Sequence, residues 1–135
     1  PDSMSGERYF SAAGGLMSSV ESYARFAMLL AGEGQLDETR LLGTRTMEVM
    51  RSEWIPDTLP GRNPGEGYGL SVRVVTDPIA MGSMLNEDTF GWSGAYGTHL
   101  IVDPVEDIVA LMFIQTPIRS MRPEFERAVM QAIVD

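Results

Sequence analysis

The stretch FGWSGAYGTHLIVDPVEDIVALMFIQ, residues 90–115, decides the fold class of this chain. Two apolar runs rich in β-branched residues, at 99–102 and 108–115, flank the polar segment Asp103-Pro104-Val105-Glu106-Asp107. Proline and acidic residues between two such runs predict a β-hairpin. A further short strand is expected at 90–94, immediately before this hairpin. The apolar run at 108–114 is a buried strand, because a membrane span needs about 20 residues. No membrane span is therefore expected.

Helical periodicity appears on both sides of this hairpin. A first helix is predicted after Ser18, which has capping-box spacing to Glu21, and is expected to stop at Gly32 and Gly34. Its expected apolar face consists of Val20, Tyr23, Ala24, Ala27 and Leu30. A second helix near Thr44 would carry Met47 and Met50 inward. A last helix has Pro123 in its first turn and an apolar stripe of Phe125, Val129, Met130 and Ile133.

One more strand is predicted at 68–75, between loops at 51–67 and 77–88 that are rich in Gly, Pro and polar residues. The order is then two helices, four strands and a helix. Neighbouring strands with helices grouped around them indicate an α+β fold with an antiparallel sheet flanked by helices. Residues 1–135 are within the size of one domain.

Composition excludes several functions. The chain has 10 basic and 19 acidic residues, a net charge of −9, which argues against nucleic acid as a partner. All basic residues are arginine, so this chain alone offers no lysine for a P-loop or a Schiff base. Without cysteine it has no thiol nucleophile and no cysteine-rich metal site. We expect no cofactor and no metal.

The N-terminal residues Pro1-Asp2-Ser3-Met4 have neither the basic region nor the apolar core of a signal peptide, and no initiator methionine stands at position 1. The chain is therefore expected to be a fragment or a processed product. Among compartments the cytoplasm is favoured.

Two motifs suggest chemistry but fit it poorly. Gly91-Trp92-Ser93-Gly94-Ala95 is similar to a nucleophile elbow, but Ala95 stands where that motif has glycine, and a strand follows instead of a helix. Gly65-Glu66-Gly67-Tyr68-Gly69 precedes a strand, so its glycines are expected to permit close backbone approach and not to bind a dinucleotide.

The polar residues of the hairpin have simple interpretations. His99 is the only histidine, and a packed or surface residue is a better interpretation than a metal ligand. Asp103, Glu106 and Asp107 lack the ligand pattern of a calcium loop and are expected to form a solvated turn.

The segment from Phe90 to Thr98, the strand after it, Asp103-Pro104, Glu106-Asp107 and the apolar strand ending in Gln115 together resemble the C-terminal part of serine β-lactamase-like hydrolases. The closest likeness is to the esterase branch related to class C β-lactamases and penicillin-binding proteins. Upstream, the segment from Ser11 to Ser19, the residues from Tyr23 to Phe26, the turn from Gly32 to Leu42 and Tyr68-Gly69-Leu70 resemble successive parts of the same family. The resemblance covers about residues 10–134 and implies the C-terminal portion of the β-lactamase/transpeptidase-like fold.

This resemblance implies roles for one short motif. The family carries Lys-Thr-Gly, His-Thr-Gly or Trp-x-Gly on an active-site strand, and Trp92-Ser93-Gly94 matches the last form. Trp92 would line the site, Gly94 would let substrate lie close to the strand, and Ser93 and Tyr96 would contribute to the substrate pocket. The backbone N–H of Ala95 would be one of two oxyanion-hole donors. Ser93 would not be the nucleophile.

The family's other two motifs are missing. Its nucleophile is the serine of an S-x-x-K motif, which cannot occur without lysine, and no tyrosine here is followed two places on by asparagine. The resemblance therefore implies the C-terminal portion of an enzyme that forms an acyl-serine intermediate on a small ester or amide substrate. The isolated chain is expected to be inactive.

A structural expectation follows from the resemblance. In the family, N-terminal strands pair beside the last C-terminal strand, so residues 108–114 would be an unpaired edge here. An apolar edge strand invites pairing with another chain. We expect a homo-oligomer, or pairing with a missing N-terminal portion. The alternatives are a non-catalytic binding or self-assembly module with the same sheet, and an unrelated α+β domain with a chance Trp-Ser-Gly.

Overall fold

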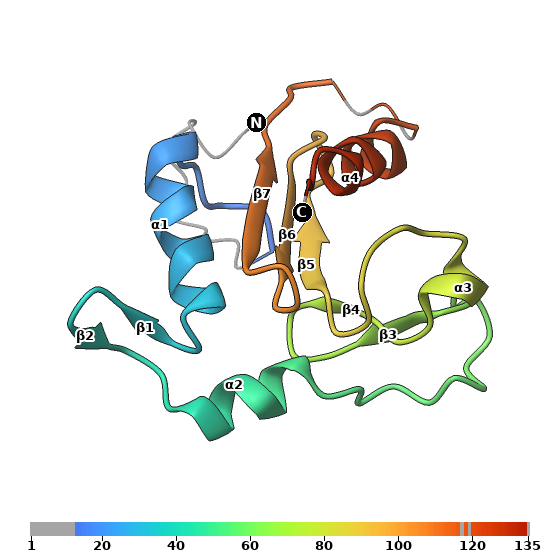
Figure 1. Ribbon diagram of the computed structural model, residues 1–135, viewed down its shortest axis with the longest axis horizontal. Coiled ribbons are helices and arrows are strands. Elements are labelled where there is room, and N and C mark those ends of the chain that lie inside the picture. The colour runs from blue at the N-terminus through green and yellow to red at the C-terminus, as the bar shows by residue number, and fades with distance from the viewer. Residues whose placement is uncertain (1–12, 117, 119, 135) are drawn as a thin grey trace.

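A computed structural model describes residues 13–116, 118 and 120–134. Its centre is a five-stranded sheet in the order β3-β4-β5-β6-β7, in which every neighbouring pair is antiparallel (Figure 1). The strands are β3 (Glu66–Tyr68), β4 (Arg73–Val75), β5 (Phe90–Ser93), β6 (His99–Asp103) and β7 (Ile108–Met112). The predicted α+β class with an antiparallel sheet is confirmed.

Four helices and a small hairpin complete the described part of the chain. The helices are α1 (Val20–Ala31), α2 (Thr44–Arg51), α3 (Pro78–Met81) and α4 (Met121–Gln131), and β1 (Gln35–Leu36) pairs with β2 (Thr39–Arg40). None of these helices has the length and apolar character needed to cross a membrane.

The two faces of the sheet are covered by different elements (Figure 1). On one face, residues of α1 and α2 pack against the inward side chains of β4, β5 and β6. This core consists of Ala27, Leu30, Met47, Val72, Val74, Phe90, Leu100 and Val102. On the other face, Val75, Leu85 and Ile101 form a smaller apolar cluster with Met81 and with Met130 of α4. The alternation of side chains along β5 and β6 divides these residues between the faces.

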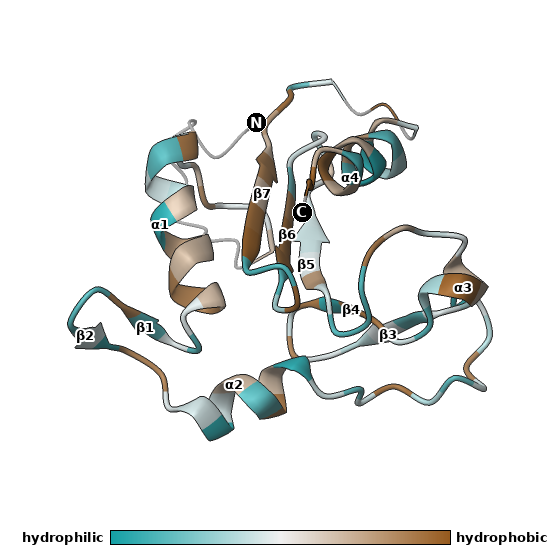
Figure 2. Cartoon of the chain, viewed as in Figure 1, coloured by the Kyte–Doolittle hydropathy of each residue, from teal (hydrophilic) through white to brown (hydrophobic). Residues whose placement is uncertain are grey.

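The hairpin predicted around residues 103–107 is confirmed, with Asp103 opposite Ile108. Strand β7 ends at Met112, shorter than the predicted run to residue 115. It lies at the end of the sheet and pairs only with β6 among the described residues. Its position agrees with the expectation that residues 108–114 form an unpaired edge. Figure 2 shows that β7 is hydrophobic along its whole length.

The single strand predicted at 68–75 is wrong. The chain reverses there and forms two antiparallel strands, with Tyr68 opposite Arg73. Ser71 has φ 66°, a turn conformation, and a Cβ at Gly69 would lie 2.1 Å from the carbonyl oxygen of Met50. The glycines of this segment do permit close backbone approach, as expected. The sequence does not reveal this reversal, because the alternation of apolar and polar residues continues through the few residues of the tight turn.

The helix boundaries differ from expectation by small steps. The N-cap of α1 is Ser19, whose hydroxyl accepts a hydrogen bond from the Ser22 N–H, and not Ser18. Val20 is 47% exposed, so it lies outside the apolar face that was predicted to include it. Gly34 has the predicted left-handed conformation, with φ 84°, but Gly32 does not.

The remaining helices show similar differences. Helix α2 begins at Thr44, after Gly43 as N-cap, and buries Met47 completely. The loop predicted at 77–88 contains the short helix α3, where Asp77 caps and Pro78 occupies the first turn. Helix α4 begins at Met121, two residues before the expected Pro123.

Candidate functional site

The end of β5 carries the residues singled out from the sequence. Trp92 is 52% exposed and Tyr96 is 60% exposed, although both are large aromatic side chains. The Tyr68 ring meets the Trp92 ring edge-on, with centroids 6.2 Å apart. The five predicted site residues therefore lie together, where β5 leaves the sheet.

A tight turn follows β5 and shapes this segment. The Gly94 N–H donates to the Thr98 carbonyl oxygen at 2.8 Å, and the Gly97 N–H donates to the Gly94 carbonyl oxygen at 3.1 Å. Ala95 is exposed between these bonds, and no described residue accepts a hydrogen bond from its N–H.

Packing within the turn itself disfavours a side chain at position 94. A Cβ there would lie 2.2 Å from Oγ1 of Thr98. Gly97 has φ 97°, which favours glycine, and a Cβ there would meet the Ile114 side chain at 2.6 Å. These contacts explain the glycines whether or not a substrate approaches the strand.

Ser93 and Trp92 face opposite sides of the sheet, because neighbouring side chains of a strand alternate. Ser93 is half-buried, and its Oγ lies 2.9 Å from Nδ1 of His99, the residue directly opposite it on β6. The other ring nitrogen of His99, Nε2, lies 3.0 Å from Oε1 of Glu126 on α4. Of the two interpretations given for His99, a packed or a surface residue, the structure shows the packed one, because the side chain is 2% exposed and both ring nitrogens contact protein groups.

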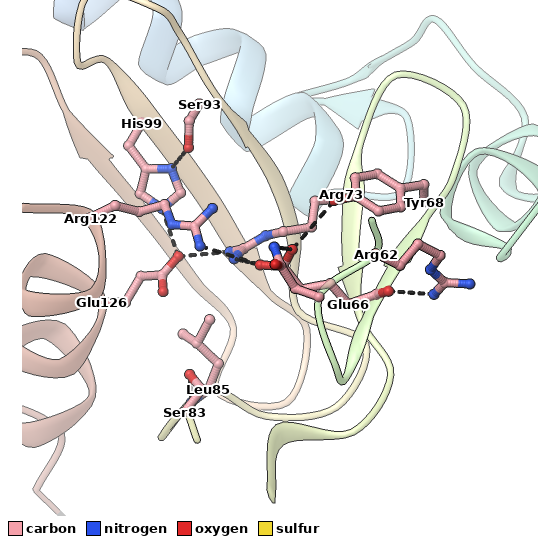
Figure 3. A network of polar contacts seen from close by, with 11 residues as sticks. Arg62, Glu66, Tyr68, Arg73, Ser83, Leu85, Ser93, His99, Arg122 and Glu126 are labelled. Atoms are coloured by element: carbon pink, nitrogen blue, oxygen red, sulfur yellow. Dashed lines mark hydrogen bonds and ion pairs between the residues drawn. The ribbon is translucent and has the colours of Figure 1, made fainter. Parts of the chain in front are cut away.

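The contacts of Glu126 continue into a buried ionic network (Figure 3). Arg73 of β4 joins two carboxylates: one terminal nitrogen lies 2.7 Å from Glu126 Oε1 and the other 3.1 Å from Glu66 Oε1. Arg122 of α4 also reaches Glu66 Oε1, at 3.2 Å. The network extends from β3 through β4 and α4 to the end of β5.

Both carboxylates of this network are stabilised in the ionised form. Burial by itself raises the pKa of Glu126, but the hydrogen bond from His99 and the charge and hydrogen bond of Arg73 outweigh it, so the pKa is lowered. Burial likewise raises the pKa of Glu66, but the hydrogen bonds from Asn63 and Arg73 and the charges of Arg73 and Arg122 outweigh it, so this pKa is also lowered.

Two clefts adjoin this network. The first, of about 250 Å³, is mostly apolar and is lined by Ser93, Gly94, Gly97, Thr98, His99, Met112, Ile114, Ile118 and Arg122. The second, of about 370 Å³, is polar and opens between α3 and α4 over Glu66 and Glu126. Among the described residues no group of three or more potential ligands is arranged to hold a metal ion.

The turn after β6 is only partly solvated. Asp103 is 1% exposed and accepts hydrogen bonds from the backbone N–H groups of Val105 and Glu106, at 2.9 and 3.2 Å. The side-chain amide of Asn86 also donates to it, at 3.0 Å. The expectation of a solvated turn is wrong for Asp103, because its carboxylate fastens the turn, while Glu106 and Asp107 are exposed.

Sequence reasoning missed Glu126, Arg73 and Glu66. Position 126 lies three and four residues before Val129 and Met130, so helical spacing places it on the expected apolar stripe of α4. A carboxylate on such a stripe signals a buried cation partner. Nothing in the sequence identifies that partner as Arg73, because β4 and α4 are far apart in the chain.

Comparison with known proteins bears on this arrangement. The model of the beta-lactamase family matches residues 1–133. This chain belongs to the beta-lactamase family. Two curated family relatives are protein Rv1367c of Mycobacterium tuberculosis strain ATCC 25618 / H37Rv and protein MT1414 of strain CDC 1551 / Oshkosh. Each is 34% identical over 117 residues, which cover 79% of this chain and 29% of the relative.

The solved structure of EstCE1, a hydrolase with promiscuous acyltransferase activity, has a similar fold. Its TM-score is 0.62 at 22% identity, over 78% of this chain and 26% of EstCE1. This likeness concerns the fold. The chain spans less than a third of the length of the two curated relatives and of EstCE1.

Proposed function

We propose that this chain is the C-terminal part of a serine hydrolase that cleaves a small ester or amide through an acyl-serine intermediate. The nucleophile and its base would belong to a segment outside these residues, since the chain has no lysine for an S-x-x-K motif. Membership of the beta-lactamase family and coverage of only 29% of the curated relatives support this proposal.

The observation that carries the proposal is the exposed end of β5. Ala95 presents an N–H without an acceptor among the described residues, directly after Trp92-Ser93-Gly94. A backbone N–H in this position can stabilise the negative charge that develops on a carbonyl oxygen during attack. Trp92, Tyr96, Ser93 and Gly94 would then form the wall beside the bound acyl group.

The type of substrate is the next step of the proposal. Trp92 replaces the cation of the Lys-Thr-Gly form with a neutral aromatic surface. That replacement favours small uncharged esters over β-lactams.

The test compares the 135-residue chain with a longer protein extended upstream through the coding sequence. Each is incubated with a fluorophosphonate and with a p-nitrophenyl ester, while intact mass and p-nitrophenol release are followed. We expect no adduct and no turnover for the chain, and both for the longer protein, with the adduct on a serine of an S-x-x-K motif. A stoichiometric adduct on Ser93, or no turnover by the longer protein, would contradict the proposal.

One observation favours a second candidate, a self-assembly module. Strand β7 is apolar and lies at the edge of the sheet. An edge of this kind offers unpaired N–H and C=O groups to another chain. An independent start codon close to Pro1, without catalytic motifs upstream, would support this candidate over the enzyme.

A further inference from the structure

A series of hydrogen bonds leads from Glu126 on α4 through His99 to Ser93 at the end of β5. A single oxygen of this carboxylate, Oε1, contacts both Arg73 at 2.7 Å and His99 Nε2 at 3.0 Å. The side chains of all three residues are at most 4% exposed. Solvent therefore competes little for the two contacts of Oε1, so the donors and acceptors in these contacts must match one another within the protein.

The protonation pattern follows from elementary hydrogen-bond rules. An ionised carboxylate can only accept, so Nε2 of His99 must carry the proton in the contact with Glu126. In the neutral ring Nδ1 is then a lone pair that accepts a hydrogen bond. Its partner at 2.9 Å is Ser93 Oγ, so the Ser93 hydroxyl donates its single proton to His99.

We propose that Glu126 and His99 are positioning residues for the end of β5: they fix the Ser93 hydroxyl as a hydrogen-bond acceptor toward the apolar cleft and hold Trp92 and the Ala95 N–H in place. This inference rests on the proposed function, because it assigns a purpose to the site described there. Ser93 lies between Trp92 and Gly94, so anchoring it on the α4 face turns Trp92 toward the opposite face.

The polarity of Ser93 has a consequence for ligand choice. Its proton is committed to His99, so a group that approaches Ser93 from the 250 Å³ cleft meets only the lone pairs of its oxygen. A carbonyl or carboxylate oxygen gains no hydrogen bond from the Ser93 hydroxyl itself. Apolar groups against Met112, Ile114 and Ile118 fit this cleft better.

The same three residues resemble a Ser–His–acid triad, but their charges do not suit nucleophilic attack. In a working triad the carboxylate stabilises the imidazolium that forms when the histidine takes the serine proton. Here Arg73 occupies the same oxygen of Glu126 as His99 does. Arg73 and Arg122 together balance the charges of Glu66 and Glu126, so Glu126 stabilises an imidazolium less than an unshared carboxylate would. The geometry therefore points to positioning.

The tautomer of His99 is a direct test, and it needs no enzymatic activity. His99 is the only histidine, so long-range ¹H–¹⁵N NMR of the ¹⁵N-labelled 135-residue chain contains one imidazole. At a pH where the ring is neutral, we expect the Nε2–H tautomer. Predominance of the Nδ1–H tautomer would overturn the proposal, and this result would be independent of whether the longer protein hydrolyses esters.

Variants separate positioning from mere structural support. Glu126→Leu keeps about the size of the side chain but removes the acceptor of the Nε2 proton, so we expect a substantial Nδ1–H population and altered amide shifts at Gly94 and Ala95. Glu124→Leu, at an exposed position on the same helix, is the matched control and should leave the spectrum of His99 unchanged. An unchanged tautomer in a folded Glu126→Leu variant would overturn the proposal.

A kinetic readout in the longer protein completes the test. Loss of positioning lowers kcat more than it raises KM, and we expect about a tenfold loss of kcat in His99→Leu. His99→Asn restores an acceptor for the Ser93 hydroxyl and should recover part of that loss. Equal kcat in wild type and His99→Leu would contradict the positioning role. Complete absence of wild-type turnover would count against the proposed function while leaving the tautomer result intact.

Discussion

The two faces of the sheet are held in different ways. The face under α1 and α2 is a continuous apolar core, whereas the face under α4 combines a small apolar cluster with four buried polar residues: Glu66, Arg73, His99 and Glu126. Apolar burial is non-directional, so it fixes which elements come together but tolerates variation in detail. The ionic network is directional, so it specifies how α4 sits on the sheet and connects it to the end of β5.

The largest effect should come from the apolar face. Phe90 is 1% exposed, so Phe90→Ala should cost about 3–5 kcal/mol of unfolding free energy through lost burial and the cavity left behind. Urea unfolding followed by tryptophan fluorescence measures this. Ile79→Ala is the control, because Ile79 is 91% exposed and its truncation should be close to neutral. A loss below about 1 kcal/mol at Phe90 would show that this core is loosely packed.

Removal of the central cation tests the polar face. Arg73→Met leaves Glu126 and Glu66 without their shared partner in a buried setting, which should cost about 3 kcal/mol of unfolding free energy. Arg25→Met breaks an exposed pair with Asp37 and should cost less than about 1 kcal/mol. If the two substitutions cost the same, the buried network contributes no more than a surface pair and the contrast between the faces fails.

Acid should weaken the polar face selectively. The pKa values of Glu66 and Glu126 are lowered in the folded protein, so both groups contribute stability above their unfolded pKa. This stability is lost as the pH falls from the unfolded range, around 4.3 for a glutamate, through the lower folded values. Unfolding curves from pH 6 to pH 3 should show a steeper acid loss for wild type than for Glu126→Gln. Parallel curves would contradict the assignment.

The smallest effect concerns the edge of the sheet. If β7 pairs with a second copy of the chain, light scattering after size-exclusion chromatography should show a dimer or larger species. Ile108→Lys places a charge at the start of this edge and should weaken association about tenfold, or about 1.4 kcal/mol. Val105→Lys in the exposed turn is the control. A wild-type monomer in dilute solution would remove the edge as an interface of this chain.

Local patterns predicted most of the elements. The hairpin of β6 and β7, the short strand β5 and helices α1, α2 and α4 are visible because their apolar periodicity and their turn or cap residues agree. The reversal at Gly69 and Ser71 escaped prediction because the alternation of apolar residues continues through it. Helix α3 escaped because it is a single capped turn within a polar loop.

The candidate site likewise has a part that the sequence predicted and a part that it did not. Trp92 to Tyr96 are contiguous, so one motif was enough to single them out, although their catalytic roles stay a proposal. The residues behind them, Arg73 and Glu126, are separated by 53 positions and meet only after β4 and α4 are placed on the sheet. No local pattern contains such a pair.

The amino-acid sequence by itself determined the fold class, the order of its main elements and the exclusion of lysine and cysteine chemistry, because composition, periodicity and turn chemistry are local properties. Only the tertiary structure decided that Glu126 contacts His99, that Arg73 joins two buried carboxylates and that Ser93 Oγ lies within hydrogen-bonding distance of His99 Nδ1. Those contacts depend on strand register and helix docking, which bring distant residues within hydrogen-bonding distance and remove the water that would otherwise satisfy them.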